Sequence, residues 1–291
     1  MLRFLINMVY LLLFIIFFGC SAVKQPKHVG NLSGKSFQDN IAHAFSVWTP
    51  DSKINIWELS GLHEGDIMLS HDEDPRNALI DTDKMWPKGI VPYYISEDEF
   101  DEEEIDIIKN AVKEIEEETC VKFRDYKKDD DDYVVVKGDA EGCWSFVGRK
   151  HGGQILNLSE KCVRHGVVVH EFLHALGLYH QQSAPNRDDY VTVNWDNIEP
   201  DHKHNFDKYN TSTVTDYGVG YDYNSIMHYS SHAFSKNEKK TLEPKQKEVK
   251  IGQRKHISDK DIKKIRKIYN CDSKSGMGEF GLSMFEDLIS L

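Results

Sequence analysis

The sequence predicts an α+β fold, because strand patterns and helix patterns both occur within one stretch of chain. Runs rich in Val, Ile, Tyr and Leu predict strands at residues 90–95, 133–137 and 154–158. Apolar periodicity predicts helices at residues 101–118 and 258–269, and an apolar run without Pro or Gly predicts a buried helix at 167–176. The 291 residues, 40% of them hydrophobic, suit one globular domain with additional processing segments.

The first and the last predicted helix each begin with residues that favour helix initiation, and each has one apolar face. Acidic residues crowd the first turn of residues 101–118, where they favour the positive end of the helix dipole. The apolar face of this helix consists of Ile105, Ile108, Val112 and Ile115. Ser258 is a suitable N-cap for the last helix. The apolar face of that helix consists of Ile262, Ile265 and Ile268.

The beginning of the chain predicts a signal peptide. Arg3 gives a positive start, and the apolar run 11–18 ends in the small residues 19–22. An uncleaved anchor is the weaker alternative, because the apolar stretch is broken at Asn7 and is shorter than the roughly 20 residues of a membrane span. A lipoprotein signal at Cys20 is weaker still. We therefore expect removal of residues 1–22 and a secreted, extracellular protein without stable membrane association.

Cysteines remaining after the predicted signal peptide support this compartment. They are Cys120, Cys143, Cys162 and Cys271. An even number in a secreted chain suggests two disulfides, with three pairings possible from sequence alone. Zinc ligation by these cysteines is a poorer explanation, because no Cys-x-x-Cys spacing occurs.

Residues 23–76 differ from the rest of the chain and predict a propeptide. The segment is polar and ends in acidic residues at 72–74, followed by Pro75 and Arg76. Pro75 and the acidic residues favour an extended, accessible chain, in which Arg76 offers a basic cleavage point. An ordinary linker is the alternative.

A metal site is predicted on the buried helix at 167–176. His170 and His174 are four positions apart and therefore project from one helical face, from which two imidazoles can bind one zinc ion. Glu171 lies beside the metal, in the position of a general base that acts on water. Gly177 can end the helix with a left-handed residue, so that His180 returns as a third ligand. Three protein ligands leave an open position, which is typical of catalytic zinc.

The pattern from His170 to His180 resembles the metzincin signature, and further motifs resemble the astacin family within that clan. Residues 181–191 resemble the segment that follows the third histidine in this family, and residues 225–229 resemble its Met-turn. Shorter matches lie at residue 86 with 91–93, at 120–123, at 143–145 and at 147–149. The resemblance covers about residues 77–271, which are nearly all of the predicted mature chain.

The resemblance implies a two-lobed, zincin-like catalytic domain at residues 77–271, followed by a tail at 272–291. The upper lobe would hold a mixed, twisted sheet and the active-site helix, and a cleft would separate it from an irregular lower lobe. The family pairing implies the disulfides Cys120–Cys271 and Cys143–Cys162.

The resemblance also implies roles for individual residues. One Zn²⁺ per chain would be held by His170, His174 and His180. Glu171 would be the general base, and the phenol of Tyr229 would donate a hydrogen bond to the oxyanion of the transition state. Met227 would form an apolar floor under the metal. From the residues alone, Met227 and Tyr229 have the character of core residues.

A second match lies in the predicted propeptide. Residues 63–66 resemble the family's Phe-x-Gly-Asp element, which implies that Asp66 binds the zinc in the zymogen and displaces water. His63 stands where Phe is usual. The resemblance places the mature start at about Asn77. In the family, a Glu after the third histidine ties down the new amino terminus, and Gln181 stands at that position here. Ala184 stands where an Arg is common in the family.

Together these features predict an astacin-like zinc metalloendopeptidase that is inhibited by Asp66 and activated by cleavage near Arg76-Asn77. We expect a monomer whose partners are protein or peptide substrates and an activating protease. Substrate would lie extended along an edge strand near residues 154–158. A zinc-binding protein without catalysis is one alternative, disfavoured because Glu171 and Tyr229 are both present. An adhesion or matrix module is the other, disfavoured because no growth-factor-like cysteine array follows Cys271 in this sequence.

Two further expectations concern partners and modification. The net charge of -12 argues against a nucleic-acid partner, because contact with phosphates requires basic surface. Glycosylation sequons begin at Asn31, Asn157 and Asn210.

Overall fold

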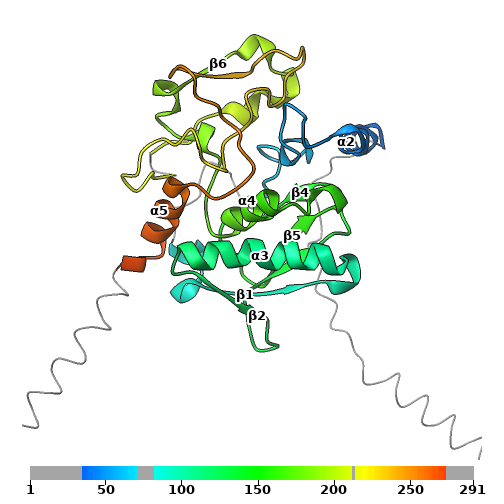
Figure 1. Ribbon diagram of the computed structural model, residues 1–291, viewed down its shortest axis with the longest axis vertical. Coiled ribbons are helices and arrows are strands. Elements are labelled where there is room, and N and C mark those ends of the chain that lie inside the picture. The colour runs from blue at the N-terminus through cyan, green and yellow to red at the C-terminus, as the bar shows by residue number, and fades with distance from the viewer. Residues whose placement is uncertain (1–34, 71–81, 212–213, 273–291) are drawn as a thin grey trace, which may run out of the picture. The chain divides into compact units, whose positions relative to one another are not determined.

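The computed structural model describes residues 35–70, 82–211 and 214–272, with side chains from residue 41 onward (Figure 1). The predicted signal peptide, the cleavage point at Arg76 and the tail after residue 272 lie outside the described residues. Within them, no helix combines the length and the apolar character that crossing a membrane requires.

A mixed sheet forms one half of the architecture, with the strand order β2-β1-β3-β5-β4. Its strands are β1 (Ile90–Ile95), β2 (Lys122–Asp125), β3 (Tyr133–Lys137), β4 (Cys143–Trp144) and β5 (Gly153–Leu158). The pairs β1–β2, β1–β3 and β3–β5 are parallel, and β4 pairs antiparallel with β5. Three consecutive valines of β3, residues 134–136, are buried, as expected for a central parallel strand covered on both faces.

The sheet order corrects one prediction from the sequence. Residues 154–158 do form a strand, but β5 is paired on both sides and is therefore not an edge strand. The edge on this side is β4. The residue pattern of a strand indicates which of its side chains are buried, but not which strands pair with it. The sequence therefore could not show whether β4 or β5 lies at the edge of the sheet.

Two long helices pack beside each other and against this sheet, as Figure 1 shows. α3 (Glu102–Glu118) begins at a capping box made by Asp101 and Glu104. α4 (His165–Ala175) is buried along nearly its whole length. The remaining α-helices are α2 (Lys35–Val47) and α5 (Asp259–Ile268), and α5 begins at a capping box made by Ser258 and Asp261. α3, α4 and α5 bear out the three helices predicted from the sequence, whereas α2 was not predicted.

The other half is irregular and has its own apolar cluster. It contains the antiparallel pair β6 (Val191–Val193) and β7 (Leu242–Pro244). Its cluster consists of Val191, Ile198, Phe206, Tyr221, Tyr229, Ala233 and Leu242. The larger cluster lies among the sheet, α3, α4 and α5. A regular part and an irregular part with separate cores agree with the predicted lobes.

Short 3₁₀ turns connect these elements. They are η1 (Trp57–Leu59), η3 (Thr82–Lys84), η4 (Pro87–Gly89), η5 (Glu97–Glu99), η6 (Glu160–Cys162), η7 (Gln181–Ser183), η8 (Arg187–Asp189), η9 (Trp195–Asn197) and η10 (Pro200–Phe206).

Two disulfides join distant parts of the chain. Cys120 is bonded to Cys271 and Cys143 to Cys162, across separations of 151 and 19 residues. In the loop-entropy picture the longer loop contributes about 5 kcal/mol and the shorter about 3 kcal/mol.

The segment before residue 70 contributes to the main core. Phe45 and Trp48, at the end of α2 and just after it, belong to the larger apolar cluster together with Ile56 and Trp57. The segment is therefore packed into the domain along described residues 41–70.

Candidate metal centre

The three predicted histidines converge on one point. His170 and His174 lie on the same face of α4, with ring centroids 4.7 Å apart. Gly177 adopts φ 107°, and the amide of Leu178 donates to the carbonyl of Leu173, which ends the helix in the expected left-handed turn. This reversal brings the ring centroid of His180 to 4.7 Å from that of His174.

Hydrogen bonds fix the orientation of all three rings. The Nδ1 atom of His170 donates to the carbonyl of Ile226 at 2.9 Å, and that of His174 donates to the carbonyl of Leu178 at 2.7 Å. The Nδ1 atom of His180 donates to a carboxylate oxygen of Glu64 at 2.8 Å. Because Nδ1 donates in each ring, the neutral form of each imidazole presents its Nε2 lone pair to a metal.

Asp66 completes the set of ligand atoms. Its carboxylate oxygens lie 3.1 Å from Nε2 of His170, 3.4 Å from that of His174 and 3.3 Å from that of His180. The four candidate ligand atoms all lie within 4.8 Å of one another. Tetrahedral zinc with bonds of about 2.0–2.1 Å would place its ligand atoms about 3.3 Å apart, which agrees with the three distances between Asp66 and the histidines.

Unsatisfied polar atoms support the same assignment. One oxygen of Asp66 and the Nε2 atoms of His174 and His180 are fully buried and have no hydrogen-bond partner among the described residues. Burial lowers the pKa of His180, but Asp66 and Glu64 outweigh it and raise this pKa to about 10. Without a metal this second proton sits on Nε2, and the same negative charge favours a metal cation in its place. His170, His174, His180 and Asp66 thus fit one zinc ion.

Glu171 lies next to this cluster in a fully buried position. Both of its carboxylate oxygens lack a hydrogen-bond partner among the described residues. Burial, and then the charge of Asp66, raises the pKa of Glu171 well above its usual value. A carboxyl group in such a place can hold and transfer a proton near neutral pH.

The predicted Met-turn, residues 225–229, contacts the first histidine, because the carbonyl of Ile226 accepts from Nδ1 of His170. Met227 is buried in the main core, and its carbonyl accepts a hydrogen bond from the amide of Gln181. Sequence reasoning missed Asp261, whose carboxylate accepts from the hydroxyl of Ser225 at 2.7 Å and from the amide of Ile226 at 2.9 Å. This contact joins the Met-turn to the start of α5.

Tyr229 is fully buried and its phenol faces the amino-terminal segment. The hydroxyl donates to the backbone carbonyl of Glu64 at 2.6 Å. In the same segment the ring of Trp57 stacks on His170 with a centroid separation of 4.2 Å. Sequence patterns did not indicate Trp57 at the metal site. Glu64 lies within the element at residues 63–66 but stands at its variable position, so the sequence predicted no role for it.

The amino-terminal segment also pairs with the edge strand. The amide of Ser145 donates to the carbonyl of Asp66 at 3.1 Å, and the amide of Met68 donates to the carbonyl of Ser145 at 2.9 Å. These bonds form a parallel bridge between Ile67 and Ser145, next to β4. The segment therefore occupies the edge of the sheet next to β4.

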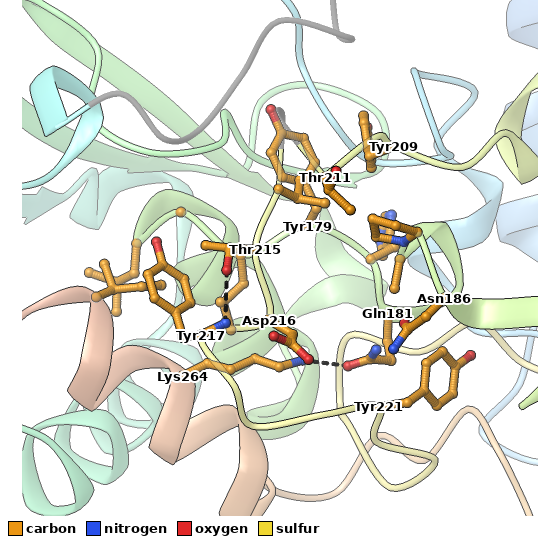
Figure 2. Close-up of a pocket in the computed structure, with 18 of the residues that line it drawn as sticks. Tyr179, Gln181, Asn186, Tyr209, Thr211, Thr215, Asp216, Tyr217, Tyr221 and Lys264 are labelled. Atoms are coloured by element: carbon orange, nitrogen blue, oxygen red, sulfur yellow. Dashed lines mark hydrogen bonds between the residues drawn. The ribbon is translucent and has the colours of Figure 1, made fainter. Parts of the chain in front are cut away.

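A pocket of about 270 Å³ is lined in part by His180. Figure 2 shows other residues that line it, among them Gln181 and Lys264. Gln181 and Lys264 both line it, and the ammonium group of Lys264 donates to the side-chain oxygen of Gln181. Burial lowers the pKa of Lys264. The resemblance predicted that Gln181 leaves the new amino terminus without an ionic partner. In the structure, the side-chain oxygen of Gln181 already accepts a hydrogen bond from Lys264. Ala184 lines the same pocket.

The other histidines in the described part of the chain lie outside the cluster of ligand atoms. His63, which stands at the usual Phe position, is 3.3 Å from the hydroxyl of Tyr209. His228 is buried and pairs with the hydroxyl of Tyr221 at 2.7 Å.

The glycosylation sequons have different environments. The side chain of Asn157 is fully buried and donates to the carbonyls of Ala140 and Gly142, so the predicted sequon there is inaccessible in this fold. Asn210 is exposed, and Asn31 lies outside the described residues.

Comparisons with known proteins agree with this geometry. A family model described as Astacin, a peptidase family, matches residues 78–270. Zinc metalloproteinase nas-4 of Caenorhabditis elegans is 36% identical over 263 aligned residues, covering 86% of this chain and 82% of that protein. High choriolytic enzyme 1, a hatching enzyme zinc-protease from Oryzias latipes, has a solved structure that matches with a TM-score of 0.59 and 32% identity, covering 71% of this chain and 100% of that one.

Other relatives are longer than this chain. Zinc metalloproteinase nas-13 of Caenorhabditis elegans is 41% identical over 196 residues, covering 67% of this chain and 43% of that protein. Meprin A subunit beta of Mus musculus is 41% identical over 215 residues, covering 73% of this chain and 30% of that protein. The chain thus spans less than half the length of these two relatives.

Proposed function

Because the chain belongs to the astacin family of zinc peptidases, we propose that it is a secreted zinc-dependent endopeptidase made as a latent precursor. The observation that carries this proposal is the convergence of three histidine Nε2 atoms on the carboxylate of Asp66, which comes from the segment before the matched domain. A fourth ligand supplied by that segment fills the position that catalysis requires to be open.

The reaction uses residues that lie together around the cluster. His170, His174 and His180 would hold the zinc, which would supply Lewis-acid chemistry for polarising a carbonyl and making water more acidic. Glu171 takes a proton from the attacking water and delivers it to the leaving amine. The phenol of Tyr229 donates a hydrogen bond to the carbonyl oxygen as it becomes negatively charged.

Substrate binds in an extended conformation along β4 (Cys143–Trp144) and its continuation at Ser145. The backbone amide and carbonyl of Ser145 already pair with the amino-terminal segment, so they are suitably placed to pair with a peptide. This edge replaces the one predicted from the sequence at residues 154–158.

Latency follows from three contacts of residues 23–76, the proposed propeptide. Asp66 takes a ligand position, the carbonyl of Glu64 holds the phenol of Tyr229, and the backbone around Ile67 covers Ser145. Cleavage near Arg76-Asn77 by an activating protease releases all three. We propose residues 77–271 as the mature catalytic domain.

Secretion rests on the signal-like residues 1–22 and on the two disulfides, which are typical of oxidising compartments. Asn210 is the proposed glycosylation site among the described residues. The partners are protein or peptide substrates and the activating protease, with the chain acting as a monomer.

The proposal is tested by following peptide hydrolysis before and after cleavage at Arg76. The full-length, zinc-loaded chain should be inactive, and cleavage should produce endopeptidase activity that a chelator removes and zinc restores. A cleaved chain that retains zinc and hydrolyses no peptide would leave only a zinc-binding protein. Equal activity before and after cleavage would refute latency alone.

A further inference from the structure

One of the three histidine ligands obtains its outer hydrogen bond from the amino-terminal segment. The Nδ1 donors of His170 and His174 are satisfied by backbone carbonyls of the matched domain itself, at Ile226 and Leu178. His180 instead donates to the carboxylate of Glu64, which is 116 positions earlier in the sequence. Cleavage of the chain would therefore remove the partner of His180 and leave the other two in place.

The carboxylate of Glu64 is held firmly at this position. Its second oxygen accepts a hydrogen bond from the hydroxyl of Ser183 at 2.8 Å, and its side chain is 2% exposed. Its backbone amide donates to the side-chain oxygen of Asn205 at 3.0 Å, and its carbonyl accepts from Tyr229. Glu64 also adopts φ 48°, a left-handed conformation that a non-glycine residue keeps only when its surroundings require it.

This contact has two consequences for a bound zinc ion. A carboxylate that accepts from Nδ1 fixes the ring in the tautomer whose Nε2 lone pair faces the metal, and it makes that nitrogen a stronger ligand. The charges also balance, because Zn²⁺ with three neutral imidazoles is neutralised by the carboxylates of Glu64 and Asp66. A buried charge is costly unless it is compensated in this way.

We propose that Glu64 is a positioning residue for the third zinc ligand, so that the amino-terminal segment retains zinc in the precursor as well as blocking the site. This inference rests on the proposed function in its assignment of residues 23–76 as a propeptide. It predicts that the precursor holds zinc more tightly than the cleaved enzyme through a residue that does not itself bind the metal.

The test measures zinc release from the uncleaved, zinc-loaded chain to an excess of a chromogenic chelator. Glu64→Gln keeps the shape of the side chain but removes its charge, and it should release zinc about tenfold faster, at the lower end of the 10–100-fold effects of outer-sphere changes. Glu58→Gln is the matched control, because Glu58 is a buried carboxylate of the same segment that contacts Ser230 and no histidine. It should release zinc at the wild-type rate.

A second comparison uses the same proteins after cleavage at Arg76 and removal of the amino-terminal fragment. The Glu64→Gln difference should disappear, because the residue has left with the fragment. Wild-type release from the uncleaved Glu64→Gln chain, equal acceleration by both variants, or a difference that persists after cleavage would each overturn the inference. None of these readouts requires peptide hydrolysis, so a failure of the proposed enzyme activity is detected separately.

Discussion

The phenol of Tyr229 donates a 2.6 Å hydrogen bond to the backbone carbonyl of Glu64, across 165 positions of sequence. Tyr229 is fully buried in this arrangement, and Glu64 also holds the ring of His180. One residue of the amino-terminal segment thus engages both the proposed oxyanion donor and a proposed zinc ligand. In the proposed mechanism, the carbonyl of Glu64 accepts the hydrogen bond that Tyr229 would donate to a substrate carbonyl.

Replacement of Tyr229 should affect catalysis more than zinc binding. In the cleaved enzyme, Tyr229→Phe should lower kcat about 100-fold to 1,000-fold, because one donor to the developing negative charge is lost. The zinc content, measured by elemental analysis, should stay at that of the wild type. A variant with unchanged kcat would show that the phenol does not act on the transition state.

Asp66 should determine whether a small inhibitor can reach the metal in the uncleaved chain. Asp66→Ala removes the fourth ligand, so the full-length variant should bind a small hydroxamate inhibitor that the wild-type precursor excludes. Binding is measured by isothermal titration calorimetry. Asp51→Ala is the control, since Asp51 is exposed in the same segment. Equal hydroxamate affinity of the wild type and Asp66→Ala would contradict the assignment of Asp66 as a ligand.

Glu58 should make the packing of the amino-terminal segment dependent on pH. Burial raises the pKa of Glu58 from 4.5 to about 7, although Ser230 and Asn55 donate hydrogen bonds to it. The folded chain therefore binds this proton more tightly than the unfolded chain. The corresponding stabilisation is complete below pH 4.5 and is lost as the pH rises through about 7.

The measurement compares the free energy of unfolding of wild type and Glu58→Gln from pH 5 to pH 8. The variant carries no titrating group there, so the wild type should lose up to about 3 kcal/mol relative to it as the pH rises. A difference between the two proteins that stays constant with pH would show that Glu58 keeps an ordinary pKa.

Lys264 should stabilise the pocket that it lines together with Gln181 and His180. Its ammonium group donates to Gln181, and it interacts electrostatically with the buried carboxylate of Asp261, which holds the Met-turn. Lys264→Met should lower the free energy of unfolding by about 1–3 kcal/mol, because a buried acceptor and a buried charge lose their partner. Lys263→Met is the control on the exposed side of the same helix. Chemical denaturation measures both, and equal effects would contradict the specific role of Lys264.

Local patterns in the sequence were sufficient to predict the helices α3, α4 and α5, three strands and the three histidines, but not α2. His170 and His174 share a helical face because they are four positions apart, and Gly177 permits the turn that returns His180. Such relationships lie within one or two turns of chain, so they leave a periodic signature.

Contacts between distant segments leave no such signature. The pairing of Glu58 with Ser230 spans 172 positions and that of Glu64 with His180 spans 116. Each depends on the complete packing of the amino-terminal segment against the domain. The same reason explains why the prediction of an edge strand at β5 was wrong, since strand order is fixed by tertiary contacts alone.

The central claim, that one zinc ion and Glu171 hydrolyse peptide bonds, is tested most directly by Glu171→Gln in the cleaved, zinc-loaded protein. Hydrolysis of an internally quenched peptide and zinc content are measured on the same samples. We expect one zinc per chain in both proteins, activity in the wild type, and a loss of at least about 100-fold in kcat for the variant. Full zinc content with equal activity in both proteins, or with no activity in either, would contradict the claim.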